Sequence, residues 1–304
     1  MDFKKELGYR IQTLREEKGL SRQAICGLED VLTTRQLQRI EKGQSLPTIA
    51  TALYIAEQLG VSVDALANNE SLELPEGYVA LKYHLNKLYH YGSEERLQQR
   101  EDIIDEIYEK YFDDLPEEEQ IVIQAKQAGI DMISTNDINY DQGLLEEYLH
   151  QVMIKEKLTL NDLEIIDLRI LSLGLKDFEK EEFIDLLSKV LLAASYFPIN
   201  DLDKVQSTII AAAGILSHYE EYDLLPDVLE VLEDIMSRRN DFQDRIFSYA
   251  LQWKIALFLN HNYEEAEENY QRVSMLVDLL TEEVLKENME LDWEQDKVRF
   301  KQMK

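Results

Sequence analysis

The sequence predicts an all-α protein in which a small N-terminal helix-turn-helix domain is followed by a longer array of helix pairs. Three observations support this prediction. Residues 3–67 contain five short segments with helical apolar spacing, separated by glycines or polar turns. From Tyr78 onward the chain has the same helical periodicity almost throughout. In this second part, aromatic residues that follow polar turns recur at nearly regular intervals, within the range of periods that is typical of stacked helix pairs.

The N-terminal segments are predicted to be helices because each has an apolar face and a stop signal. Residues 3–18 form the first, which Gly19 ends. Ser21 caps a short second helix that contains Cys26, for which we expect a buried packing role rather than that of a redox sensor. Helices over residues 49–59 and 63–67 complete the domain. Five short helices joined by tight turns match the helix-turn-helix architecture.

The third short helix, within residues 33–43, has the composition of a DNA-reading element. Thr33 or Thr34 can cap it, and Gly43 can supply the left-handed residue behind it. Its outward positions carry arginines and glutamines, which match guanine, adenine or phosphate. A solvated helix face is the alternative. The candidate DNA-binding residues are Arg35, Arg39, Gln36, Gln38, Thr34 and Arg22.

Several motifs of this domain carry a family resemblance. They are Ile11-x-x-Leu14-Arg15-x-x-Lys18-Gly19-Leu20-Ser21, Arg39-Ile40-Glu41-Lys42-Gly43 and Leu46-Pro47-Thr48. Across the whole N-terminal domain the chain is similar to the Cro/lambda-repressor type of DNA-binding domain. One stretch departs from the family pattern: Glu29-Asp30-Val31-Leu32 replaces the usual glycine before the reading helix, and the turn is one residue longer.

The net charge of −29 lies entirely outside the N-terminal domain. Residues 1–66 contain nine basic and nine acidic side chains, whereas the whole chain has 32 Lys and Arg against 61 Asp and Glu. An acidic body repels phosphate, so we expect only the N-terminal domain to touch DNA. The acidic turn that contains Asp114, Glu117 and Glu118 is either a solvated loop or an autoinhibitory contact that engages Arg35 or Arg39.

Residues 68–77 contain polar residues, a proline and a glycine, show no period, and are predicted to link a domain over 1–67 to one over 78–304. Each repeat of the second domain begins at an aromatic residue, and these aromatics are Tyr140, Phe178, Tyr222 and Tyr263. We interpret the repeat as a tetratricopeptide-like α-solenoid, with an unrelated helical bundle as the alternative. The segment Asn262-Tyr263-x-x-Ala266-x-x-x-Tyr270 is similar to the second helix of a tetratricopeptide repeat.

A solenoid of this kind has a concave face lined by one helix of each repeat, here including residues 202–217 and 242–259. Arg100, in a helix near 94–112, is either a clamp for a ligand carboxylate or part of an internal salt bridge. The remaining candidate ligand-binding positions, for which ordinary interhelical hydrogen bonds are the alternative, are Thr208, Ser207, Ser248, Gln252 and Lys254.

Nearly the whole chain resembles the Rgg group of peptide-pheromone-responsive regulators of Gram-positive bacteria, and within it the streptococcal competence regulators. Matching stretches include Arg35-Gln36-Leu37, Tyr108-Glu109-Lys110 and Leu115-Pro116-Glu117-Glu118-Glu119. The resemblance implies that a short hydrophobic pheromone is re-imported, binds the concave face and frees the helix-turn-helix domain. A homodimer then binds double-stranded DNA at a palindromic promoter. It also implies that Arg100 holds the peptide C-terminus, although His90 and Gly92 depart from the closest pattern.

The C-terminal helix, predicted over about 281–300, either pairs with a second subunit or caps the solenoid. The sequence contains no HExxH, Walker, GxSxG or CxxC motif, and its five histidines are scattered, so we expect no enzyme activity, cofactor or metal. No apolar run approaches the roughly 18 residues that span a bilayer, and we expect a cytoplasmic protein without a membrane partner. The alternative functions are a peptide-independent repressor and a helical-repeat scaffold that does not bind DNA.

Overall fold

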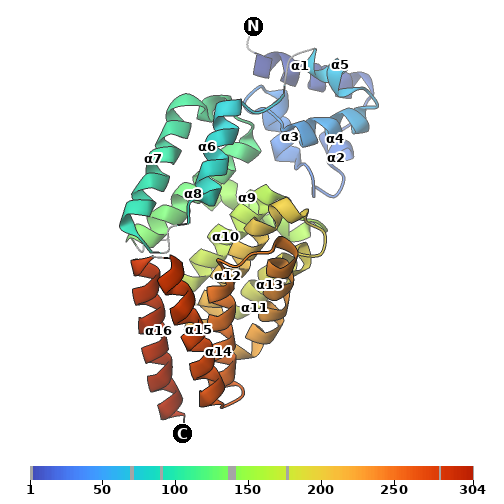
Figure 1. Cartoon of the computed structure of the whole chain (residues 1–304). Coiled ribbons are helices and arrows are strands. Elements are labelled where there is room, and N and C mark those ends of the chain that lie inside the picture. Colours follow the sequence, from blue (N-terminus) through green and yellow to red (C-terminus); the bar gives the residue numbers. More distant parts are fainter. Residues whose placement is uncertain are drawn as a thin grey trace. The chain divides into compact units, whose positions relative to one another are not determined.

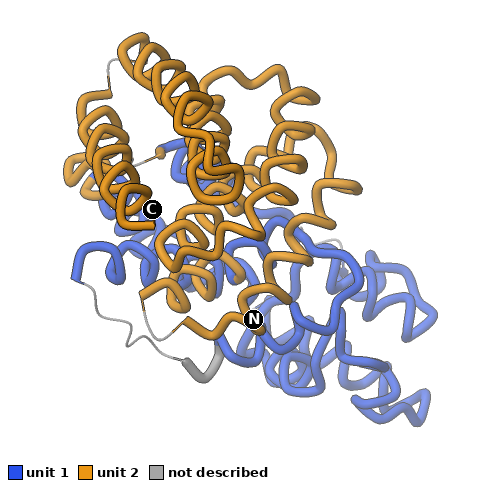
Figure 2. Tube along the Cα trace, turned by 90° about the horizontal axis from the view of Figure 1, so that it is seen from below, with its two compact units in different colours: residues 1–88, 99–165 blue, residues 89–98, 166–304 orange. Residues whose placement is uncertain are grey.

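The computed structural model describes residues 3–68, 72–89, 92–135, 142–175, 178–280 and 282–303, and all regular elements in these ranges are helices (Figure 1). The chain divides into two compact units (Figure 2). Unit 1 comprises residues 1–88 and 99–165, and unit 2 comprises residues 89–98 and 166–304. The predicted helix-turn-helix domain therefore shares unit 1 with the first helices of the predicted solenoid.

The five short helices predicted for the N-terminal domain are confirmed. They are α1 (Phe3–Glu17), α2 (Arg22–Cys26), α3 (Thr34–Glu41), α4 (Ile49–Leu59) and α5 (Val63–Ala67). Their apolar faces form one core, in which Ile11, Leu37 and Ile55 are fully buried. Cys26 belongs to the same core, and its burial raises the pKa of the thiol to about 12. It therefore stays a protonated, inert packing residue, as expected.

The reading helix α3 begins at a capping box. The Thr33 hydroxyl accepts from the Gln36 backbone N–H at 3.1 Å, and the Gln36 side chain accepts from the Thr33 backbone N–H at 2.8 Å. In the longer turn before α3, Glu29 has a φ of 62°, and its carboxylate accepts from the Thr34 N–H at 2.9 Å. A non-glycine residue in this left-handed region is strained, and the bond to Thr34 offsets part of that cost. Gly43, with a φ of 64°, follows the helix as predicted.

Glycine at position 8 is required by the close approach of α1 and α3. A methyl group added at Gly8 would lie 2.2 Å from the Ile40 carbonyl oxygen, whereas one added at Gly129, inside a helix of the same unit, would meet no atom within 4 Å. We expect Gly8→Ala to lower the free energy of unfolding of unit 1 by about 1–3 kcal/mol through overpacking. Gly129→Ala, the matched control, should raise it by about 0.5–1 kcal/mol. Urea unfolding monitored by circular dichroism tests both, and equal effects of the two variants would contradict the prediction.

The remaining helices of unit 1 are α6 (Glu76–Lys87), most of α7 (Glu94–Lys110), α8 (Glu117–Thr135), α9 (Gln142–Ile154) and the start of α10 (Leu160–Leu175), with the short 3-10 turn η1 (Phe112–Asp114) before α8. The predicted linker overlaps the start of α6, and its residues 69–71 lie outside the described residues, as do Tyr140 and His90. A buried Glu119 joins three helices, because it accepts from Tyr78 Oη at 2.5 Å, Lys82 Nζ at 2.6 Å and Asn161 Nδ2 at 2.9 Å.

Unit 2 contains the regular helix pairs that the repeated aromatics predicted. After the end of α10 come α11 (Lys180–Ala193), η2 (Ile199–Asp201), α12 (Leu202–His218), η3 (Tyr222–Leu224), α13 (Leu225–Arg239), α14 (Arg245–Phe258), α15 (Tyr263–Leu280) and α16 (Glu283–Gln302). Each of α11–α15 packs against the next helix (Figure 1). The repeated aromatics bind neighbouring helices together: Phe178 stacks on Tyr219 at 4.4 Å between ring centroids, and Tyr222 stacks on Phe258 at 4.1 Å.

Candidate nucleic-acid interface and ligand cavity

Arg39 of the reading helix is bound by carboxylates of α8 and α9. Its Nε donates to Glu117 Oε2 at 2.6 Å and one terminal nitrogen donates to Glu117 Oε1 at 2.7 Å, which is a bidentate pair. Glu147 accepts from the two terminal nitrogens at 3.1 and 3.3 Å. Only 25% of the Arg39 side chain is exposed. The predicted contact between Glu117 and an arginine of the reading helix is therefore present, and Arg39 is that arginine.

The surroundings of this pair favour the charged arginine. Burial lowers the pKa of Arg39, but hydrogen bonds from Glu117 and Glu147 and their negative charges outweigh it, so the pKa is raised overall. The Tyr148 hydroxyl donates to Glu117 Oε1 at 3.0 Å. Burial first, and the neighbouring Glu117 second, raise the pKa of Tyr148 well above its usual value, so it remains a donor. Glu117 is thus held in position by an arginine and a tyrosine from different helices.

Sequence reasoning missed the contribution of α9. Besides Arg39, Glu147 accepts a hydrogen bond from the Thr33 hydroxyl at 2.8 Å, and Gln151 accepts from the Gln36 side chain at 3.2 Å. Glu147 and Gln151 are four residues apart and share a helix face, but Glu146 and His150 of the same helix have the same spacing. Which face of α9 meets the reading helix depends on packing between segments that are far apart in the sequence, so no local pattern reveals it.

Two other predicted contacts take a different form. Glu118 accepts hydrogen bonds from the hydroxyls of Thr48 and Thr51 at the start of α4, rather than from an arginine. Burial raises the pKa of Glu118, and the hydrogen bond from Thr51 partly counteracts this. Asp114 is exposed, and within the described residues it has no hydrogen bond or ion pair with Arg35 or Arg39. Glu118 therefore contributes to the contact through hydroxyl groups, and Asp114 lies outside it.

The predicted DNA-binding residues differ in how accessible they are. Arg35 is exposed, and no hydrogen bond or ion pair of its side chain occurs in the part of the chain that the structure describes; Gln38 and Thr34 are half-buried. The expectation that Gln36 points outward is wrong for this conformation: the residue is 5% exposed because its side chain closes the capping box. Arg22 pairs with the buried Glu41, which also binds Arg15, so it ties α2 to α3.

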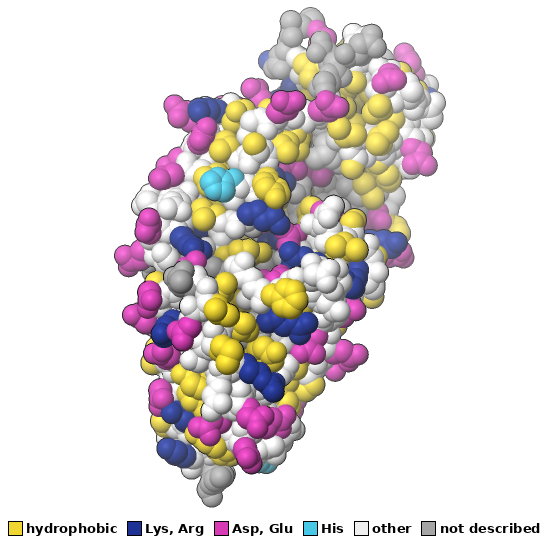
Figure 3. Space-filling model, in the orientation of Figure 1, with side chains coloured by type: hydrophobic (Ala, Val, Ile, Leu, Met, Phe, Trp, Pro, Cys, Tyr) yellow, Lys and Arg dark blue, Asp and Glu magenta, His cyan; other side chains and the backbone are white. Residues whose placement is uncertain are grey.

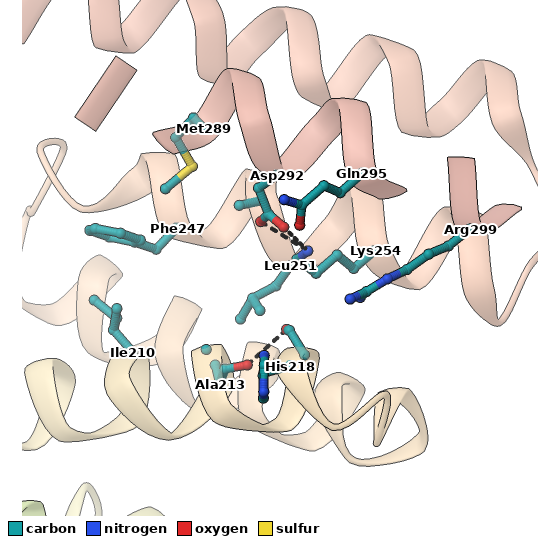
Figure 4. A pocket seen from close by; sticks show the side chains of 13 residues that line it. Ile210, Ala213, His218, Phe247, Leu251, Lys254, Met289, Asp292, Gln295 and Arg299 are labelled. Atoms are coloured by element: carbon teal, nitrogen blue, oxygen red, sulfur yellow. Dashed lines mark hydrogen bonds and ion pairs between the residues drawn. The ribbon is translucent and has the colours of Figure 1, made fainter. Parts of the chain in front are cut away.

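A cavity of about 270 Å³ lies between α12, α14 and α16 of unit 2 (Figure 4). Ile210, Phe247, Leu251 and Met289 give it apolar walls. Its charged lining consists of Lys254, Asp292 and Arg299. Lys254 is only 4% exposed and donates to Asp292 at 2.9 Å and to the fully buried Asp296 at 2.6 Å.

Of the ligand-binding positions predicted from the sequence, only Lys254 lines this cavity. Thr208 and Ser207 donate to the Lys204 carbonyl of their own helix, and Ser248 and Gln252 donate to Glu233 of α13. In unit 1, Arg100 donates to the carbonyls of Leu85 and Leu88 at 3.0 and 2.7 Å, which caps the C-terminal end of α6. These five side chains therefore have internal structural partners in this conformation.

The described residues contain no group of three or more His, Cys, Asp or Glu side chains placed to hold a metal ion. None of the described helices is both long enough and apolar enough to cross a membrane.

Comparison with known proteins supports the two-part architecture. Residues 11–66 match the family model described as helix-turn-helix, and residues 75–293 match the model described as ComR tetratricopeptide. No curated protein sequence matches the chain significantly.

Solved structures of ComR superpose on nearly the whole chain. ComR from Streptococcus suis is 32% identical, with a TM-score of 0.80, 97% of this chain and 96% of that chain covered. The apo form from S. thermophilus is 29% identical, with a TM-score of 0.82 and 96% and 99% coverage. The S. thermophilus ComR complex with DNA and its signalling peptide ComS is 28% identical and covers the same shares, but its TM-score is 0.67. The chain belongs to the ComR family of helix-turn-helix regulators with a tetratricopeptide domain.

Proposed function

We propose that the chain is a cytoplasmic, peptide-responsive transcriptional regulator that activates competence-type genes. In this proposal α3 reads a palindromic promoter, and Glu117 with Glu147 holds Arg39 away from DNA until a re-imported hydrophobic peptide binds. The observation that carries the proposal is the double carboxylate clamp on Arg39. A guanidinium that is bound on both sides by carboxylates cannot bind guanine or phosphate at the same time.

The switch is a population shift between two states. The closed state gains the Arg39 clamp, the Thr33–Glu147 hydrogen bond and the Thr48 and Thr51 bonds to Glu118. DNA binds only the open state, so a peptide that binds the open state more tightly increases the fraction competent to bind DNA. The contacts of Arg39 with Glu117 and Glu147, all within unit 1, support assigning the present conformation to the closed state.

A palindromic site requires two copies of the chain, because each half-site takes one reading helix. The C-terminal helix α16 has exposed apolar residues at Leu291 (58%) and Val298 (54%). We propose this face for the dimer of the activated protein. The structure of ComR from S. thermophilus contains both DNA and its signalling peptide, which supports the proposal that DNA and a peptide are the two partners of this chain.

The exposed Arg35 provides the direct test of the DNA-binding face. We expect Arg35→Ala to weaken binding to the preferred duplex at least about tenfold, since one arginine–guanine pair contributes about 1–3 kcal/mol in each half-site. Lys18→Ala, which removes an exposed positive charge of the same unit outside α3, is the control. The wild-type protein first selects its preferred duplex from a random DNA pool. The selection is carried out with and without synthetic heptapeptides that are randomised over Gly, Ala, Leu, Phe, Tyr and Trp. The affinity of each variant for the selected duplex is then measured by fluorescence anisotropy.

Three outcomes separate the proposed function from its alternatives. Selection that needs peptide supports the regulator with a switch. Equal selection without peptide contradicts the switch and leaves a peptide-independent repressor. Failure to recover DNA under any condition contradicts the DNA-binding function and leaves a helical-repeat scaffold. Unchanged affinity of Arg35→Ala would contradict the assignment of this face of α3.

A further inference from the structure

The side-chain carboxamide of Gln36 has different partners at its two ends. Its oxygen Oε1 accepts from the Thr33 backbone N–H at 2.8 Å, and its nitrogen Nε2 donates to Gln151 Oε1 of α9 at 3.2 Å. Because a backbone N–H can only donate, the bond from Thr33 fixes which end of the carboxamide is the oxygen. The nitrogen is therefore the end that the reading helix presents to α9.

The oxygen of Gln36 is committed to the cap. Another contact of this oxygen, from Gln151 Nε2, is 3.5 Å long, which exceeds the usual length of an N–H···O hydrogen bond. Two carboxamides that are both free form a reciprocal pair with two bonds of about 2.9 Å. Of the two contacts between Gln36 and Gln151, only the one from Gln36 Nε2 lies within the usual range. Gln36 thus meets α9 as a donor rather than as a two-sided partner.

The cap belongs to the reading helix and does not depend on α9. Both hydrogen bonds of the capping box join Thr33 and Gln36, and the fully buried Leu37 anchors the same turn in the core of the N-terminal domain. The bond to Gln151, in contrast, is one of the contacts with α9 that the proposed open state loses. When α3 separates from α9, the carboxamide therefore keeps its orientation and only Nε2 needs a new partner.

Gln36 Nε2 is directed to the same side of α3 as the Arg39 guanidinium. The two residues are three apart on α3, and their partners Gln151 and Glu147 are four apart on α9. Residues at the N-terminal end of a reading helix are those that contact base edges. On the face seen in Figure 3, Asp and Glu side chains are spread over both units. Such a surface repels phosphate, so recognition of DNA depends on the donors of the reading helix.

A carboxamide held in this way cannot use the usual pairing of glutamine with adenine. That pair requires both ends, because Oε1 accepts from adenine N6 while Nε2 donates to N7. Guanine presents two acceptors, N7 and O6, in the same groove, and both suit the hydrogens of Nε2. We propose that Gln36 is a specificity-determining residue of the DNA-bound state, which donates through Nε2 alone and selects guanine over adenine. The inference rests on the proposed function and specifies one base that α3 reads.

A variant that keeps the cap but reverses the outward atom tests the inference. Glutamate also closes a capping box at this position, so Gln36→Glu keeps an acceptor for the Thr33 N–H but presents a second oxygen in place of Nε2. Gln36→Met removes the donor without adding a charge, and it keeps the bond from its own backbone N–H to the Thr33 hydroxyl. Gln58→Glu is the control, because it adds the same charge to the N-terminal domain at an exposed position of α4.

Each full-length protein selects duplexes from the random DNA pool under the peptide condition in which the wild type selects DNA. The base frequencies are then compared position by position. Fluorescence anisotropy measures the affinity for the wild-type duplex and for a duplex in which the differing base pair is exchanged in both half-sites. Because the fraction of open protein scales the affinity for every duplex equally, the ratio of two affinities reports on the reading helix alone.

We expect the wild type to select guanine at one position of each half-site at which Gln36→Glu selects cytosine, whose N4 amino group donates to a carboxylate. The wild type should bind its own duplex at least about tenfold more tightly than the duplex with cytosine at that position. Gln36→Glu should reverse this preference, and Gln36→Met should lose it. Gln58→Glu should keep the wild-type base frequencies.

Selection by the wild type of adenine, or of any base other than guanine, at the position that changes would overturn the inference while the DNA-binding function stands. Unchanged base frequencies with uniformly weaker binding and a smaller dependence on salt would also overturn it, because Nε2 then contacts a phosphate. If Gln36→Glu recovers no duplex, Gln36→Met decides, and a guanine preference that persists in it would overturn the inference. Failure of the wild type to select any duplex would contradict the proposed function and the inference together.

Discussion

The double variant Glu117→Gln/Glu147→Gln is expected to bind DNA without peptide about tenfold to a hundredfold more tightly than the wild type. Glutamine keeps the shape and an acceptor oxygen of each side chain but removes its charge. A hydrogen bond to a charged partner contributes about 1.5–3 kcal/mol, and about 1.4 kcal/mol corresponds to a factor of ten in affinity. The closed state therefore loses stability relative to the open state, which does not use these contacts. Fluorescence anisotropy with the selected duplex, in the absence of peptide, measures the change.

Glu118→Gln is the matched control for this prediction. Glu118 lies on the same helix as Glu117, and the substitution removes one negative charge, against two in the double variant. Its partners are the hydroxyls of Thr48 and Thr51, which can also donate to a glutamine oxygen. Its effect on peptide-free DNA binding should be much smaller than that of the double variant. Similar gains for Glu118→Gln would indicate a general effect of net charge on DNA affinity. No gain for the double variant would show that the Arg39 clamp does not restrain the reading helix.

Lys254→Met is expected to lower the free energy of unfolding of unit 2 by about 3–5 kcal/mol, because it leaves Asp296 buried without its cation. Asp296 has no exposed surface, and its carboxylate accepts from Lys254 and Trp253. Both tryptophans of the chain, Trp253 and Trp293, lie in unit 2 with ring centroids 5.8 Å apart. Urea unfolding followed by tryptophan fluorescence therefore reports on this unit.

The pH dependence of the same variant gives a second readout. Burial raises the pKa of Asp296 above its ordinary value, and Lys254 partly counteracts this, so removing Lys254 raises that pKa further. The folded state then binds a proton more tightly than the unfolded state. Its stability should consequently increase as pH falls through the raised folded-state pKa toward the ordinary aspartate pKa, and decrease as pH rises through the folded-state pKa.

Two controls test the role of the buried pair. The double variant Lys254→Met/Asp296→Leu should recover part of the lost stability, and Lys286→Met should leave the unfolding midpoint unchanged. A Lys254→Met variant as stable as the wild type would show that the buried pair does not contribute to the stability of unit 2.

The helices and the family of this protein follow from local features of its sequence. Ser21, Thr33 and Gly43 act where the pattern places them, because capping and the left-handed turn depend only on the neighbouring backbone. The regular recurrence of aromatics predicts the helix pairs of unit 2 for a similar reason, since each repeat packs only on its neighbours. For the acidic turn that contains Glu117 the sequence offers two alternatives, a solvated loop or a contact with Arg35 or Arg39, and the hydrogen bonds between Glu117 and Arg39 are seen only in the structure.

The tertiary structure alone decides which side chains are available to a ligand. Arg35 and Arg39 are equivalent by spacing, yet Arg35 is exposed and Arg39 is bound, because Glu147 approaches from a helix that is distant in the sequence. Gln36 has the composition of a base-reading residue, but its own capping box and Gln151 bury it. In unit 2, Ser248 and Gln252 bind Glu233 instead of lining the cavity, while Arg299, which no motif marks, points into it. The physical reason is that helical spacing fixes which residues share a face, whereas the packing of distant helices fixes what that face meets.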